Sequence, residues 1–144
     1  MDIDNFAASF QSCTLRPEEW THSAHLVIGL WHVDRFGPHE ALERLRTGIR
    51  RLNESFGGAN TATSGYHETI TAAYVTLLAQ FNGRCQADVA LADRVAQLLA
   101  GPLAARDILF AFYSRERLMS TEARASWVEP DLAQLNLSVI NTPV

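Results

Sequence analysis

The chain has 144 residues and a formal net charge of −4, because 16 acidic residues outweigh 12 basic ones, all of them arginine. A chain of this length buries about 70% of the surface that it exposes when unfolded, so we expect one domain over residues 1–144 with room for an internal pocket. An acidic chain lacks the cationic face that binding to a phosphate backbone requires. We therefore predict no nucleic-acid partner.

The N-terminal sequence and the cysteines both favour a cytoplasmic protein. The first ten residues carry two acids and no basic region ahead of an apolar run. No stretch approaches about 18 consecutive apolar residues, so we expect no membrane segment. Cys13 and Cys85 match neither a metal-binding spacing nor a disulfide framework, as is typical of the reducing cytosol.

Apolar residues recur every three or four positions along most of the chain, which predicts an all-α fold, a single compact bundle of five or six helices. Glycine-proline pairs at 37–38 and 101–102 interrupt the pattern, and we expect helices to end there. The residues from Pro130 onward are expected to form an extended tail. The expected helices cover residues 3–11, 17–35, 38–52, 66–81, 88–100 and an apolar segment from Asp107, with a loop at 53–65 and a short capped segment that ends near Trp127.

The bundle is expected to be organised around the helix 17–35. Pro17 at the first helical position, followed by two glutamates, is a good signal for a helix start. At about 100° per residue, tryptophans and aliphatic residues fall on one side of this helix, and His22, His25 and His32 fall on the other. A surface helix would carry Lys, Glu or Gln on that second side, so the imidazoles predict a polar seam that faces inward.

A second polar seam is expected on the helix 66–81, which Ser64 can cap. Tyr66 and every third or fourth residue after it form a core stripe, and His67 and Tyr74 lie on the adjacent strip. We expect this helix to face the helix 17–35. The two seams would then meet inside the bundle.

Histidines on two facing helices predict a metal site. His22 and His25 are one turn apart, so both rings can point at one ion, and His67 is the natural third ligand. A divalent ion held in this way, zinc or iron by preference, keeps a position open for water or substrate. The sequence therefore predicts a small metal-dependent enzyme.

The residues around these histidines suggest how a substrate would be handled. Glu68 could act as general acid or base on a metal-bound water, and Tyr74 or Arg115 could orient a small polar or anionic substrate. Hydrolase, lyase and oxygenase chemistry are all compatible with such a site, in that order of preference.

Two other interpretations use the same residues. The histidines could serve as acid and base without a metal, since an imidazole titrates near neutral pH. They could also be hydrogen-bonded core residues in a non-catalytic helical module that binds a partner or forms a homodimer. An apolar fraction of 47% with only 19% charged residues would suit such pairing.

Four phrases give the chain a resemblance that spans nearly its whole length: WTHSAHL at 20–26, GYHETIT at 65–71, FYSRERLMS at 112–120 and ARASWVEPDL at 123–132. Together they resemble a group of small bacterial proteins, and this resemblance implies membership without implying a reaction. A looser likeness is to the DinB-like metalloenzymes, helical bundles with a triad of histidine ligands. In that group the close histidine pair comes late in the chain, whereas here it comes early.

Overall fold

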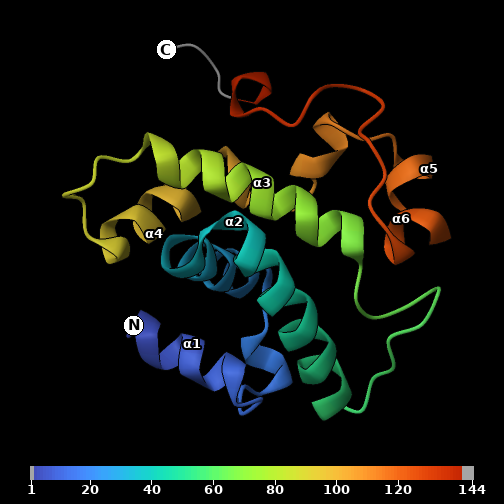
Figure 1. Ribbon diagram of the computed structural model, residues 1–144, viewed down its shortest axis with the longest axis horizontal. Helices are drawn as coiled ribbons and strands as arrows, with labels where there is room; N and C mark the ends of the chain where they lie inside the picture. The colour runs from blue at the N-terminus through green and yellow to red at the C-terminus, as the bar shows by residue number, and fades with distance from the viewer. Residues whose placement is uncertain (1, 141–144) are drawn as a thin grey trace.

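The computed structural model describes residues 2–140, and its secondary structure within that range is entirely helical (Figure 1). This confirms the predicted all-α bundle. There are six α-helices and four short 3-10 helices in the described residues. The α-helices are α1 (Ile3–Gln11), α2 (His22–Ser55), α3 (Glu68–Arg84), α4 (Leu91–Ala100), α5 (Arg115–Leu118) and α6 (Thr121–Ala125), and the 3-10 helices are η1 (Pro17–Glu19), η2 (Pro102–Ala104), η3 (Ile108–Ala111) and η4 (Leu137–Val139).

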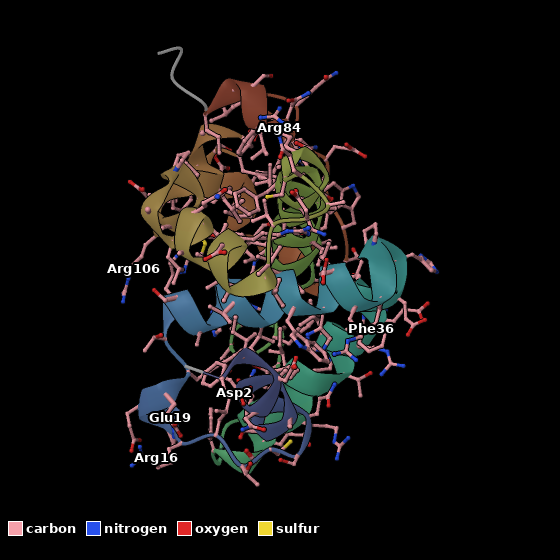
Figure 2. All side chains as sticks on the ribbon, turned by 90° about the vertical axis from the view of Figure 1, so that its left-hand side faces the viewer. Asp2, Arg16, Glu19, Phe36, Arg84 and Arg106 are labelled. Carbon is pink, nitrogen blue, oxygen red and sulfur yellow. The ribbon has the colours of Figure 1, made fainter. Side chains whose placement is uncertain are left out.

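The long helix α2 is two helical segments joined by a sharp bend at Gly37. This glycine has φ 76° and ψ 165°, a backbone conformation outside the helical region, and Pro38 follows it. Only glycine adopts this region readily, and proline can begin a helix but not continue one. Figure 2 shows the chain turning back beside Phe36, so that residues 38–55 run under residues 22–36. The break predicted at 37–38 is therefore confirmed.

The first segment of α2 is the middle layer of the molecule. Figure 1 shows α3 on one side of it and α1 on the other. The approach to α3 is close at Gly29, where an added Cβ would lie 2.6 Å from Cδ1 of Leu78. Phe10 of α1 approaches Gly48 just as closely from the other side. Two glycines in α2 therefore set how near its neighbours can come.

The helix that contains His22 begins five residues later than predicted. Pro17–Glu19 forms only the 3-10 turn η1, in which the Glu19 carboxylate accepts a hydrogen bond from the Arg16 backbone N–H at 2.9 Å. The chain then leaves the helical conformation at Trp20, and Thr21 caps α2 by accepting a bond from the Ala24 N–H at 3.2 Å. A threonine cap satisfies an otherwise free donor of the first turn. The histidine pair therefore lies in the first turns of α2.

The apolar segment after Asp107 does not form the single helix that its composition predicts. It forms the short 3-10 helix η3 and then the four-residue helix α5, which Ser114 caps through a bond from the Arg117 N–H at 3.2 Å. Phe112 and Tyr113 are fully buried between these two turns. Burial rather than helical periodicity explains the apolar run, since a short irregular segment can be hydrophobic on every side when it is surrounded.

The C-terminal segment runs along α3, as the hydrogen bonds of two polar side chains of α3 show. Thr69 donates to the Ser126 carbonyl at 2.8 Å and accepts from the Val128 N–H at 3.1 Å. Gln80 makes a similar pair of bonds, donating to the Leu135 carbonyl and accepting from the Leu137 N–H. The expected extended tail is thus fixed to the bundle up to η4. Across residues 2–140, no helix combines the length and hydrophobicity needed to cross a membrane.

Replacing Gly37 by alanine should lower the free energy of unfolding by about 1–3 kcal/mol, because a Cβ strains this positive-φ conformation. The space around Gly37 is open, so conformation alone decides the result. Gly83 is the matched control, since it lies in α3 with nothing near its Cβ position. There the same change should raise stability by up to about 1 kcal/mol. Urea unfolding of both variants measures the difference, and equal effects would contradict the assigned bend.

Candidate functional site

A small pocket lies between the start of α2, the second half of α2 and the middle of α3. Its volume is about 80 Å³, room for on the order of five water molecules. The walls are mostly aliphatic, and its polar groups come from two histidines, a threonine and a tyrosine. The lining residues that matter below are Trp20, His22, His25, Gly29, Thr71 and Tyr74.

His22 has a buried ring nitrogen without a hydrogen-bond partner. Its Nε2 is inaccessible to solvent and contacts no donor or acceptor in residues 2–140. The ring lies edge-on to Tyr74, with centroids 6.0 Å apart. Burial lowers the pKa of His22, the positive charge of Arg106 lowers it further, and the Ala104 carbonyl acts in the opposite direction. The imidazole is therefore neutral at pH 7, and one of its polar atoms is unsatisfied.

His25 stands at the mouth of the same pocket. Its ring packs edge-on against Trp20 with centroids 4.0 Å apart. Desolvation of the ring by the packed side chains around it lowers the pKa of His25 to about 4, and the neighbouring His22 adds to this effect. The residue nevertheless keeps part of its surface exposed to water. His25 is thus a second neutral imidazole, reachable from solvent.

Tyr74 and Thr71 supply the polar groups from α3. Burial raises the pKa of Tyr74 to about 12, and Asp107 adds to this shift. The Tyr74 hydroxyl therefore stays protonated and can donate a hydrogen bond. Thr71 has its own hydroxyl committed to the His67 carbonyl at 2.9 Å. Of these two hydroxyls, the one on Tyr74 is therefore the one that could donate a hydrogen bond to a bound molecule.

Arg106 and Asp107 act on the site from the segment between η2 and η3, and sequence reasoning missed both. Their charges reach His22 and Tyr74, respectively. They belong to no motif and lie more than 80 residues after His22 in the chain. No periodic signal could have identified them.

His67 does not reach this pocket. It caps α3, with Nδ1 accepting a bond from the Ile70 N–H at 3.1 Å, and its Nε2 lies 2.8 Å from the Leu118 carbonyl. Because Nδ1 accepts, Nε2 carries the proton and donates. Neither nitrogen has a free lone pair, so in this arrangement His67 could not serve as a metal ligand. The expected cap, Ser64, lies outside the helix start.

Glu68 and Arg115 also lie away from the histidine pair. Glu68 accepts two bonds from Arg46, at 2.8 and 2.7 Å, and a third from the Tyr66 hydroxyl at 2.8 Å. These partners, Arg46 foremost, lower the pKa of Glu68. Arg115 is exposed on α5, with its guanidinium 4.5 Å from the centroid of the Phe110 ring. Neither residue lines the pocket.

The structure thus brings together His22, His25 and Tyr74 of the six predicted site residues. Within residues 2–140, no three His, Cys, Asp or Glu side chains are grouped so that they could hold one metal ion. The arrangement offers two neutral bases and one hydroxyl donor on an apolar background. No protein-family model, curated protein or solved structure matches the chain, so the site is interpreted from its own geometry.

Stability should fall as the pH drops from about 6.5 toward 4. The pKa of His25 is lower in the folded state than the usual 6.5, so in this window the unfolded chain takes up a proton that the folded chain does not. Above this window the contribution of His25 is fully present. Urea unfolding between pH 7.5 and 5 should show a shallower decline for His25→Gln than for the wild type. The control is His39→Gln, at a ring that is 94% exposed, and it should follow the wild type.

The same substitution at two histidines should separate their roles. His67→Leu leaves the Leu118 carbonyl and the Ile70 N–H without partners and should cost about 2 kcal/mol or more. His22→Leu removes one unsatisfied nitrogen and frees only the Ala104 carbonyl, so it should lower the free energy of unfolding by no more than about 1 kcal/mol. Denaturant unfolding compares the two. A cost at His22 as large as that at His67 would mark His22 as an ordinary core residue.

Proposed function

We propose that this protein is a small enzyme that binds a compact, mostly apolar substrate in the pocket between α2 and α3 and transfers a proton with its histidines. The observation that carries the proposal is the buried Nε2 of His22, which has no partner in the described residues. A buried polar atom left in this state costs about 1–3 kcal/mol, and a ligand with a matching polar group removes that cost. Such features concentrate at functional sites.

The protonation states favour a division of roles. His22 is neutral at pH 7 and can accept a proton from a substrate O–H, N–H or acidic C–H group. Tyr74 stays protonated and can donate a hydrogen bond to an oxygen on which negative charge develops. His25 can pass the proton on to water, because it is exposed at the mouth. Proton abstraction next to a carbonyl, with the proton passed on to water, uses these three functions.

The apolar walls of the pocket restrict how polar its substrate can be. Leu26, Leu45, Ile49, Val75 and Leu78 line the pocket together with the polar groups. A highly charged molecule would lose its hydration there without finding an opposite charge in the lining. The substrate is therefore expected to carry one or two polar groups on a small hydrocarbon body.

A metal-dependent reaction is the second candidate, and the spacing of His22 and His25 favours it. Their rings lie one turn apart at the same pocket, and the free Nε2 of His22 could ligate zinc or iron. These two residues would hold the ion, which would supply a Lewis acid for hydrolysis. The three-histidine site of the sequence prediction would require His67 to give up both of its hydrogen bonds. Elemental analysis of untagged protein distinguishes the candidates: the metal site predicts close to one equivalent of ion that His22→Leu removes.

The proposal is tested by titrating two small probes of nearly equal size, pyrrole and furan, followed by ligand-observed NMR. Wild-type protein should bind pyrrole about fivefold more tightly than furan, because the pyrrole N–H can donate to His22 Nε2 and the furan oxygen cannot. His22→Leu should bind both probes equally, and His39→Gln should keep the wild-type preference. Equal binding of the two probes to the wild type, or a preference that survives His22→Leu, would contradict the proposed role of this nitrogen.

A further inference from the structure

A second hollow, with cationic walls, lies at the opposite end of α3 from η4. Its volume is about 340 Å³, and Arg50 of α2, Arg124 of α6 and Tyr66 contribute to its lining. Figure 1 shows the loop that precedes α3 beside α6, at this end of the molecule. The hollow shares none of its lining residues with the histidine pocket.

Both arginines are held in place by contacts to Tyr66 and its neighbour. The guanidinium of Arg50 lies 5.0 Å from the centroid of the Tyr66 ring. Arg124 donates to the Gly65 carbonyl at 2.7 Å and lies 3.5 Å from the Tyr66 carbonyl. Gly65 has φ 83°, and an added Cβ would meet the Ala59 carbonyl at 2.6 Å. The loop conformation that positions Arg124 therefore depends on this glycine.

Neither arginine has a carboxylate partner in residues 2–140, although acidic residues are near. Glu68 is occupied by two hydrogen bonds from Arg46. Glu54, one turn after Arg50 in α2, instead accepts a bond from the Asn60 amide at 3.4 Å. Two arginines without a carboxylate at ion-pair distance in the described residues therefore line one hollow, in a chain whose net charge is −4.

We propose that this hollow binds a phosphate group, either free or as a phosphate monoester. Two guanidinium groups match the charge of a phosphate dianion better than that of a single carboxylate. Arginine also presents several N–H donors in a planar fork that suits phosphate oxygens. Arg124 still has N–H groups free to donate after its bond to Gly65, and the Arg50 guanidinium has no other hydrogen-bond partner in the described residues.

The test is a titration of the full chain with inorganic phosphate, followed by NMR chemical shifts or calorimetry. Wild-type protein should bind phosphate in the millimolar range, more weakly at high salt. Arg50→Gln and Arg124→Gln should each weaken binding about tenfold, because each loses a charged hydrogen bond. Arg51→Gln is the matched control, since Arg51 is the next residue of α2 but lines a different hollow. It should leave binding unchanged.

Further arms separate the charge of Arg124 from its contact with the loop. Arg124→Lys keeps the charge, so it should retain more phosphate binding than Arg124→Gln. Acetate should bind more weakly than phosphate, and methyl phosphate should bind as well as phosphate if the natural ligand is an ester. Equal weakening by Arg51→Gln, or no phosphate binding by the wild type, would overturn the site. His22→Leu should not affect phosphate binding. The phosphate site and the histidine pocket can therefore be tested independently.

Discussion

The close contact of α2 with α3 at Gly29 is the constraint on which the rest of the structure depends. A side chain larger than hydrogen at this position would collide with Leu78, so the backbone of α2 lies directly against an aliphatic side chain of α3. His25 and His22 precede Gly29 by about one and two helical turns, on the same face. Both Gly29 and Leu78 line the pocket that these histidines also line. The tight contact therefore forms part of the wall of this pocket.

Burial has different consequences for each histidine, and the partners of the ring nitrogens explain why. His32 is buried with Nδ1 2.7 Å from the Ile28 carbonyl, so burial lowers its pKa without leaving that nitrogen unsatisfied. His67 uses both nitrogens, one as a helix cap and one across to Leu118. His22 alone among these three has a buried nitrogen with no partner in the described residues. Buried polar groups are nearly always paired, so this exception distinguishes a candidate site from a structural histidine.

Periodicity was enough to predict the all-α fold and the break at Gly37, because both follow from the residues of one segment. The helix starts were harder to predict from the sequence, since they depend on which side chain caps the first turn. Thr21 and His67 cap α2 and α3, whereas starts at Pro17 and Ser64 were expected, and the cap engages Nδ1 of His67, the predicted third metal ligand. The pairing of Glu68 with Arg46, 22 residues earlier, depends on how α2 and α3 are packed. Such long-range pairs have no local signature, and the same holds for Asp107.

The second half of α2 contributes residues to both the histidine pocket and the arginine hollow. Leu45 and Ile49 line the histidine pocket, while Arg46 and Arg50, each one residue further on, meet Glu68 and Tyr66. A helix turns by about 100° per residue, so these two pairs lie on adjoining strips of its surface. Arg44, on the same half of α2, is instead paired with Glu40. Sequences that specify a fold satisfy such groups throughout, and local exceptions are expected where function opposes stability. The Nε2 of His22, unpaired within residues 2–140, is an exception of this kind, and the bend at Gly37 places Leu45 and Ile49 of the second half-helix against the pocket that holds it.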